Sequence, residues 1–198
     1  MAANTYLTPE ERTLLESVRV GIAGAGGLGS NCAMHLVRSG VKHITIADFD
    51  VVNESNLNRQ FFFRDQIGQK KVEAVKENLL RIEPDADIRA VDMRLDASSA
   101  REIFADCGIV VEAFDAVDAK VMLVSALASS GKKLVTASGL AGWGRSNAMR
   151  VRKMGSIVAI GDGETSVRAG VAPASPRVGI AAAMEANAVV SLLLCCEP

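Results

Sequence analysis

The stretch from Val18 to Gly29 reads VRVGIAGAGGLG, and it decides the fold. Its first half is an apolar run of strand length at residues 18–23, and its second half has the glycine spacing GxGxxG. Helical periodicity follows at residues 29–39, and a second apolar strand follows at residues 43–49. A strand, a tight glycine turn, a helix and another strand in this order predict a βαβ unit whose two strands lie parallel.

The alternation of strand and helix continues through most of the remaining chain. We expect strands at residues 88–93, 109–114 and 133–137, and helices from residue 68 to Pro84, at residues 99–105 and at residues 118–130. Polar alternation at residues 147–153 and 156–160 is typical of short antiparallel strands. After a loop at residues 161–174, a last helix is expected with Ser175 as its N-cap, followed by Pro176, and an end near Leu194. The sequence therefore predicts an α/β fold, a Rossmann-like, doubly wound, mostly parallel sheet with an antiparallel edge in the C-terminal third.

Length and composition restrict the chain to one domain and exclude several classes of protein. Its 198 residues, of which 49% are hydrophobic and 23% charged, suit a single domain over residues 1–198. The net charge of −1 provides no overall field for nucleic acid or for an anionic membrane surface. The N-terminus has no apolar signal segment, and Glu185 interrupts the most apolar stretch, at residues 179–196. We therefore expect a cytoplasmic protein with no membrane span.

The cysteine pattern argues against a metal framework. The four cysteines are Cys32, Cys107, Cys195 and Cys196, and none of them forms a C-x-x-C pair. Because structural zinc is usually held by such closely spaced pairs, we expect no bound zinc.

The glycine turn predicts a phosphate-binding site. Its glycines are Gly24, Gly26, Gly27 and Gly29, and they lie where small residues bring backbone N–H groups close to a phosphate. Two carboxylates, Asp48 and Asp50, follow about 20 residues further on, where a carboxylate accepts hydrogen bonds from ribose hydroxyls. Packing alone would also explain the glycines, and Asp50 would equally cap the following turn.

A segment of donors and cations distinguishes a triphosphate from a dinucleotide. Beyond the second strand the chain offers Ser55, Asn56 and Arg59, and Lys71 comes in the first turn of the next helix. Two cations beside a glycine loop suit a triphosphate, because the charge on pyrophosphate must be neutralised as it leaves. A solvated charged surface is the other interpretation of these cations.

A third carboxylate, Asp115, follows the fourth strand at the same carboxyl edge of the predicted sheet. Open α/β sheets bind ligands at this edge, so the glycine loop, Asp48 and Asp115 meet in one crevice. A carboxylate there suits Mg²⁺ that bridges phosphate oxygens. The other interpretation is that Asp115 caps the next helix.

Together these segments resemble the ubiquitin-activating-like adenylyltransferases, the ThiF/MoeB/HesA family that acts on bacterial sulfur-carrier proteins. The likeness rests on residues 24–30, 48–50, 55–60 and 68–71 and on Asp115, and its most specific part is the Asp…Ser-Asn-Leu-x-Arg-Gln pattern. The short length, with residues 152–155 and 161–163, is similar to the shorter thiamine-biosynthesis branch of that family, which lacks zinc cysteines.

The resemblance implies an enzyme, a nucleotidyltransferase that uses MgATP to adenylate the C-terminal glycine carboxylate of a ubiquitin-fold sulfur carrier. The implied carrier is ThiS-like and ends in Gly-Gly, the implied pathway is thiamine thiazole formation, and the family also implies a homodimer. The carboxylate is ionised at neutral pH, so no general base is needed. Carried onto this sequence, the glycine loop, Asp48, Asp50 and Ser55 bind ATP, Asn56, Arg59 and Lys71 contact its phosphates, Asp115 holds Mg²⁺, and the expected catalytic residues are Arg59, Lys71 and Asp115.

Two other functions stay open. Ala116 stands where the family commonly has Asn, and Lys120 where it has Arg. Ala116 and the missing family cysteines suit a module that binds ATP or AMP without turnover. An NAD(P)-dependent oxidoreductase would explain the glycine loop and one carboxylate, but neither the two cations nor the third carboxylate.

A second glycine-rich segment is a candidate for contacting the carrier. Residues 139–144, with Trp143 and Arg145, would form a channel for a Gly-Gly tail, because glycine walls allow close backbone approach. An ordinary turn around the tryptophan is the other interpretation.

Overall fold

The computed structural model describes residues 6–167 and 171–195, and its centre is a seven-stranded sheet. The strands are β1 Arg19–Ala23, β2 His43–Asp48, β3 Asp87–Asp92, β4 Ile109–Glu112, β5 Lys133–Ala137, β6 Arg150–Met154 and β7 Ile157–Gly161. Their spatial order is β3-β2-β1-β4-β5-β7-β6. All neighbours pair in parallel except β6 and β7, which pair antiparallel at one edge. The predicted doubly wound sheet with an antiparallel C-terminal edge is confirmed.

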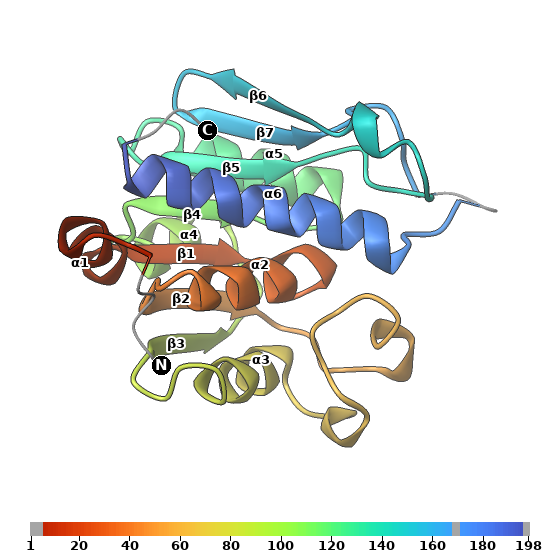
Figure 1. The fold of residues 1–198 in the computed structure, drawn as a ribbon. Coiled ribbons are helices and arrows are strands. Elements are labelled where there is room, and N and C mark those ends of the chain that lie inside the picture. The colour runs from red at the N-terminus through yellow and green to blue at the C-terminus, as the bar shows by residue number, and fades with distance from the viewer. Residues whose placement is uncertain (1–5, 168–170, 196–198) are drawn as a thin grey trace.

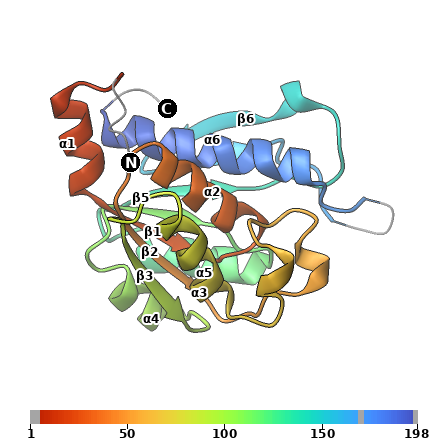
Figure 2. The same ribbon diagram turned by 60° about the horizontal axis from the view of Figure 1, so that its bottom comes forward.

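Helices cover both faces of the sheet (Figure 1). They are α1 Pro9–Ser17, α2 Gly27–Arg38, α3 Lys71–Leu80, α4 Ala97–Ile103, α5 Val117–Leu127 and α6 Ser175–Leu193, and short 3-10 turns lie at η1 Glu54–Asn56, η2 Arg64–Gln66 and η3 Ser146–Ala148. Helices α2, α3 and α6 lie on one face and α4 and α5 on the other, as the two views in Figures 1 and 2 show. The central strands are buried by both layers, which explains why they read as continuous apolar runs.

Two apolar cores follow from this layering. The larger core lies beneath α2, α3 and α6, and the smaller one lies beneath α4 and α5 around Phe104, Leu123 and Leu127. Among the described residues, no helix is both long enough and apolar enough to cross a membrane.

The strand order reverses between β1 and β4. From β1 the chain moves outward to β2 and β3, then crosses back to β4 and continues to β5 and β7. The carboxyl ends of β1, β2 and β4 therefore meet at one edge, on the right of Figure 1. Doubly wound sheets bind ligands at this position.

The end of the fourth strand differs from the prediction and changes the place of Asp115. β4 ends at Glu112 and not at residue 114, because its ladder with β1 ends where β1 gives way to the glycine turn, at Ala23. Asp115 therefore lies in the loop between β4 and α5.

The C-terminal boundaries also differ. β6 begins at Arg150 and not at residue 147, because residues 146–148 form the turn η3. The N-cap of α6 is Ala174, with Ser175 and Pro176 inside the first turn, and no side chain caps this helix. The predicted Ser175 cap is wrong for this reason.

Helix α1 is a feature that the sequence pattern did not predict. The Thr8 hydroxyl accepts a hydrogen bond from the Glu11 N–H at 3.2 Å, and the Glu11 carboxylate accepts one from the Thr8 N–H at 2.8 Å. This capping box starts the helix. Leu15 is its one buried residue, so apolar periodicity gives no helical signal.

Candidate functional site

The glycines after β1 have different structural roles. Gly24 adopts a φ of +103°, which favours glycine. A Cβ on Gly29 would lie 1.8 Å from the carbonyl oxygen of Gly24, and one on Gly27 would lie 2.9 Å from Val178 of α6. A Cβ on Gly26 would meet nothing nearer than 3.8 Å, so space remains open beside this residue.

The N-terminus of α2 is open to an anion. Its N-cap is Gly26, which offers no side-chain hydrogen bond to the first turn. The backbone N–H groups of that turn therefore point outward without a capping side chain, and the helix dipole favours negative charge beside them. This cradle fits a phosphate group, as the sequence predicts.

Asp48 holds the glycine turn against β2. Its carboxylate accepts a hydrogen bond from the Ala25 N–H at 2.6 Å and another from the Asp50 N–H at 2.8 Å. These contacts show a structural role for Asp48 at the end of β2, and ribose binding by the same carboxylate stays a prediction.

Lys71 and Asp50 form an ion pair beside this turn. The Lys71 Nζ lies 2.8 Å from Asp50 Oδ2, and the Lys71 N–H donates to the Asp50 carbonyl at 3.0 Å. The lysine side chain is 7% exposed, whereas the aspartate side chain is 48% exposed. The structure thus confines Lys71 and lets Asp50 face solvent.

Arg59 is held next to the glycine turn by Asn31. The Asn31 side-chain amide donates to the Gly27 carbonyl at 2.7 Å and to the Arg59 carbonyl at 2.9 Å. The Arg59 guanidinium donates to the Ser55 carbonyl at 3.2 Å and to Asn58 Oδ1 at 2.8 Å. The motif alone gives no sign of Asn31, which comes to Arg59 through the tertiary fold.

Asn56 has a local role in its loop. Its side-chain oxygen accepts a hydrogen bond from the Asn53 N–H at 3.0 Å and so caps η1. The side-chain oxygen of Asn56 is thus occupied, and the predicted phosphate contact depends on its side-chain NH2 group.

Asp115 is exposed at the same edge of the sheet. It makes no hydrogen bond or ion pair within residues 6–167 and 171–195. Ala116 is the N-cap of α5, so the interpretation of Asp115 as a cap is wrong. A Cβ on Gly24 would lie 2.9 Å from the Ala113 oxygen and 3.4 Å from Phe114, so the segment that leads to Asp115 packs behind the glycine turn.

A magnesium ion would find few protein ligands at this edge. No three His, Cys, Asp or Glu side chains gather into a metal site in the described part of the chain. Mg²⁺ that serves a nucleotide is commonly held by one or two carboxylates together with phosphates and water. Asp115, with its uncommitted oxygens, fits that arrangement.

A buried polar cluster surrounds Glu112, the last residue of β4, and no spacing in the sequence indicates it. Glu112 is fully buried and accepts hydrogen bonds from Lys120 at 3.0 and 3.1 Å, from Thr136 at 2.6 Å and from the Phe114 N–H at 2.8 Å. Lys120, which replaces an arginine expected from the resemblance, also donates to the Ala137 carbonyl at 3.1 Å. Its charge is therefore used inside the protein.

A second buried ion pair joins the C-terminal loops to α6. Arg177 and Asp162 are 3% and 2% exposed, and they form a direct salt bridge. Arg177 also donates to the Gly144 carbonyl at 2.7 Å. Burial would raise the pKa of Asp162, but amide hydrogen bonds from Thr165 and Glu164 and the nearby guanidinium bring it below the ordinary value.

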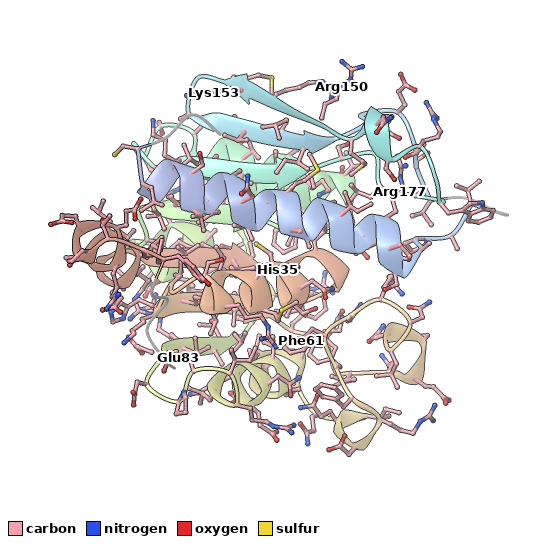
Figure 3. All side chains as sticks on the ribbon, in the orientation of Figure 1. His35, Phe61, Glu83, Arg150, Lys153 and Arg177 are labelled. Atoms are coloured by element: carbon pink, nitrogen blue, oxygen red, sulfur yellow. The ribbon has the colours of Figure 1, made fainter. Side chains whose placement is uncertain are left out.

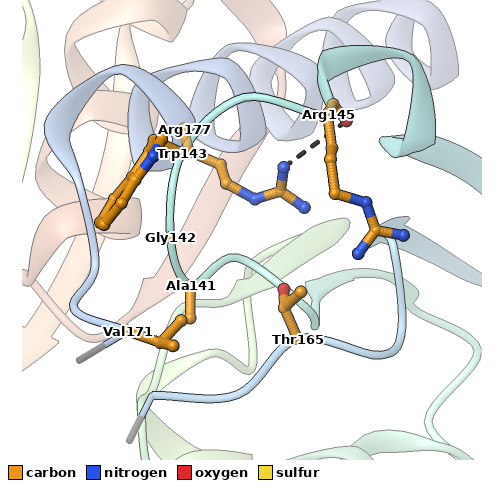
Figure 4. A pocket seen from close by; sticks show the side chains of 7 residues that line it. All are labelled: Ala141, Gly142, Trp143, Arg145, Thr165, Val171 and Arg177. Atoms are coloured by element: carbon orange, nitrogen blue, oxygen red, sulfur yellow. Dashed lines mark hydrogen bonds between the residues drawn. The ribbon is translucent and has the colours of Figure 1, made fainter. Parts of the chain in front are cut away.

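A hollow of about 220 Å³ opens where these loops meet (Figure 4). Its lining residues are Ala141, Gly142, Trp143, Arg145, Thr165, Val171 and Arg177. A neighbouring hollow of about 210 Å³ shares Arg145, Thr165 and Val171 with it. Figure 3 labels Arg177 at the start of α6, and the next residue, Val178, packs against Gly27. Residues of the second glycine-rich segment, the one predicted to contact the carrier, thus line this hollow. The first turn of α6 lies between the hollow and the glycine turn.

Residues 3–198 of this chain match the ThiF family. The chain belongs to this family. The match spans the glycine turn, the cations and the C-terminal hollow, so the family resemblance expected from the sequence is confirmed.

Two relatives of this chain are named as adenylyltransferases. The chain is 36% identical over 127 residues to "Adenylyltransferase and sulfurtransferase UBA4" of Eremothecium gossypii, which covers 64% of this chain and 29% of that protein. It is 29% identical over 195 residues to "Molybdopterin-synthase adenylyltransferase" of Escherichia coli, covering 90% of this chain and 74% of that protein. This ThiF-family chain thus spans less than a third of the length of the UBA4 relative.

Solved structures show the same fold. The E. coli tRNA N6-threonylcarbamoyladenosine dehydratase TcdA, in complex with AMP, superposes with a TM-score of 0.86 over 94% of this chain and 90% of that chain, at 21% identity. The fold of this chain is therefore shared with an enzyme that is named for a modified nucleoside of tRNA.

Proposed function

We propose that this protein uses ATP to adenylate the C-terminal glycine carboxylate of a ubiquitin-fold sulfur carrier. The observation that carries the proposal is the uncapped start of α2, with Asp48, Arg59 and the Lys71–Asp50 pair around it. The names of the relatives support the nucleotidyltransferase activity, and TcdA, which has the same fold, is known in complex with AMP and with ATP.

In the proposed reaction the carrier carboxylate attacks the α-phosphorus of ATP. A bond forms between the carboxylate oxygen and phosphorus, the bond from phosphorus to the β-phosphate oxygen breaks, and pyrophosphate leaves. The N-terminal amides of α2 and the side chains of Arg59 and Lys71 stabilise the charge that develops on the phosphates. Asp50 positions Lys71 for this task through its ion pair at 2.8 Å.

Asp115 would hold Mg²⁺ at this edge. When bound, the ion would neutralise phosphate charge and orient the leaving pyrophosphate. Asp115 is suited to this role because its carboxylate, unlike that of Asp48, is not engaged by backbone amides.

The hollow lined by Trp143 and Arg145 would receive the carrier tail. It is adjacent to the first turn of α6, which contacts Gly27, so an extended tail that leaves the hollow reaches the nucleotide over a short path. Glycine residues suit this path because they carry no side chain that would contact the walls.

A protein carrier fits this chain better than a tRNA. The net charge of −1 gives no overall attraction to a nucleic-acid backbone. Residues 152–155 and 161–163 favour a ThiS-like carrier and thiamine thiazole formation among the possible pathways. We also propose that the protein acts as a homodimer.

The test is ATP–pyrophosphate exchange with Mg²⁺ and a ThiS-like carrier that ends in Gly-Gly. The expected result is exchange that requires the carrier and is lost when its two glycines are removed. ATP binding without exchange for any Gly-Gly carrier would overturn the proposal in favour of a binding module. Binding of NADH in place of ATP would favour an oxidoreductase, and exchange that depends on tRNA would favour a tRNA substrate.

Two neighbouring lysines provide a matched pair of variants. Lys71→Ala is expected to reduce exchange about a hundredfold or more, because the phosphate charge loses a confined cation. Lys70→Ala removes a lysine that pairs with Asp92 at 3.1 Å and is half exposed, and it is expected to change exchange less than about twofold. Arg59→Ala, at a site with less burial than Lys71, should reduce exchange as Lys71→Ala does. Full exchange in both the Lys71→Ala and Arg59→Ala variants would contradict the assigned roles.

A further inference from the structure

An arginine without an acidic partner lies beside the carboxyl end of β2. The Arg94 guanidinium sits over the Phe49 ring, 3.9 Å from the ring centre. Arg94 is exposed, and within the described residues it forms no ion pair or hydrogen bond. Its contact with Phe49 therefore fixes its position without using its charge or its N–H groups.

The three aspartates at the carboxyl ends of β2 and β3 have other partners than Arg94. Asp92, two residues before Arg94, pairs with Lys70 at 3.1 Å, and Asp50 pairs with Lys71 at 2.8 Å. Asp48 is engaged by the Ala25 and Asp50 amides. The Arg94 guanidinium is thus a cation without an ion-pair partner among the described residues, close to the carboxyl ends of β2 and β3.

The topology places Arg94 beside the position of a ribose. Asp48 pairs with Asp92 across β2 and β3, and the Met93 N–H donates to the Asp48 carbonyl at 3.2 Å. In a doubly wound sheet the phosphates lie on the glycine turn and the ribose at the acid that ends β2. A base on the side of that ribose away from the phosphates would meet the residues that follow β2 and β3, among them Phe49 and Arg94.

We propose that Arg94, supported by Phe49, forms the surface on which the purine base of the bound nucleotide stacks. A guanidinium is planar and weakly hydrated, so it packs one face on an aromatic ring and offers the other to a second π system. Phe49 is 41% exposed, so the ring also leaves apolar surface for the base. This inference rests on the proposed nucleotide function and adds a residue that sets affinity through the base.

A simpler role for Arg94 is to cover an exposed aromatic ring with its side chain. The two roles predict different effects of an Arg94 substitution on ligand binding. A covering role affects the free protein, whereas a base-stacking role affects ATP and leaves a ligand without a base unaffected.

The test measures dissociation constants of ATP and of inorganic tripolyphosphate by calorimetry for the wild type, Arg94→Ala and Arg94→Lys. Arg94→Ala is expected to weaken ATP binding about tenfold and tripolyphosphate binding less than twofold. Arg94→Lys keeps the charge without the planar group, and it is expected not to restore ATP binding. The control is Arg101→Ala, which removes an exposed arginine of α4 that contacts no aromatic ring among the described residues, and it should leave both constants unchanged.

The other outcomes refute either the stacking role of Arg94 or the proposed nucleotide function. Unchanged ATP binding in Arg94→Ala refutes the stacking role while the proposed function stands. An equal loss for both ligands, or full restoration by Arg94→Lys, shows that Arg94 acts on phosphate charge. A wild type that binds neither ATP nor tripolyphosphate refutes the proposed function itself, and a melting temperature of the ligand-free protein that falls in Arg94→Ala without a change in ATP binding supports the covering role.

Discussion

At the scale of single residues, Glu185 of α6 is a buried carboxyl group without a hydrogen-bond partner in the described part of the chain. It is fully buried, and neither of its oxygens accepts or donates a hydrogen bond within residues 6–167 and 171–195. Burial raises its pKa well above the ordinary value, Glu112 raises it further, and Lys120 opposes the shift. Burial, followed by the nearby charge of Glu185, also raises the pKa of the Cys32 thiol on α2.

We expect Glu185 to make the protein less stable as pH rises. The unfolded chain releases this proton near pH 4.5, whereas the folded protein retains it, so the folded state binds more protons and the free energy of unfolding falls with pH. Glu185→Gln should flatten this decline, as measured by urea unfolding from about pH 5 to pH 9. Glu73→Gln, at an exposed position on α3, is the control, and equal slopes for the wild type and Glu185→Gln would contradict the assignment.

Two glycines of the same motif should respond differently to alanine. Gly29→Ala places a methyl group 1.8 Å from the Gly24 oxygen, so we expect it to destabilise the protein by about 3 kcal/mol or more, or to prevent folding. Gly26→Ala has 3.8 Å of clearance and a negative φ, so we expect a loss below about 1 kcal/mol together with weaker ATP binding. Urea unfolding of both variants tests this, and similar stabilities would show that the turn relaxes around the methyl group.

At the scale of elements, loss of the buried ion pair between Asp162 and Arg177 of α6 should lower the free energy of unfolding strongly. Asp162→Ala leaves the Arg177 guanidinium buried without its counter-charge, and we expect a loss of about 3–5 kcal/mol in the free energy of unfolding. Replacing both partners, Asp162→Leu with Arg177→Met, should cost less than the single change because no charge stays buried.

The exposed ion pair nearby is the matched control for this prediction. Arg145 and Glu164 lie 3.6 Å apart with side chains 60% and 74% exposed, so Glu164→Ala is expected to cost less than about 1 kcal/mol. An Asp162→Ala variant as stable as Glu164→Ala would show that water reaches Arg177.

The same elements show what the sequence could predict. The glycine turn, Lys71 at the start of α3 and the alternation of strands and helices along the chain depend on short-range patterns, and for this reason the sequence predicts them. The contacts of Arg177 with Asp162 and of Glu112 with Lys120 join different elements, so no spacing in the chain indicates them. The sequence does not predict helix α1, because this helix has a capping box but no apolar face. Leu15 is its one buried residue.

At the scale of the whole molecule, acidic groups with lowered pKa values set the response to acid. Hydrogen bonds from Arg19 and His43 lower the pKa of Asp87, and the contacts described above lower that of Asp162. Such groups contribute stability above their unfolded pKa of 3.8 and lose it as pH falls through the folded value. We therefore expect the free energy of unfolding to decrease between about pH 5 and pH 2.

Urea unfolding across this range, with Asp87→Asn as the comparison, measures the effect. The variant should show a shallower decline because its side chain no longer takes up a proton on unfolding. An equally steep decline in the variant would assign the acid response to other carboxylates.

The outer strand β6 has a consequence for how copies of this protein meet. It is the last strand in the described sheet, its five residues are all exposed, and it contains Arg150, Arg152 and Lys153, two of which are labelled along its length in Figure 3. Two molecules that approached edge to edge would bring these cations together, and their repulsion opposes the continuous pairing from which fibrils grow. The cations of this strand thus oppose aggregation through the sheet edge. Concentrated salt screens exposed charges and therefore weakens this repulsion.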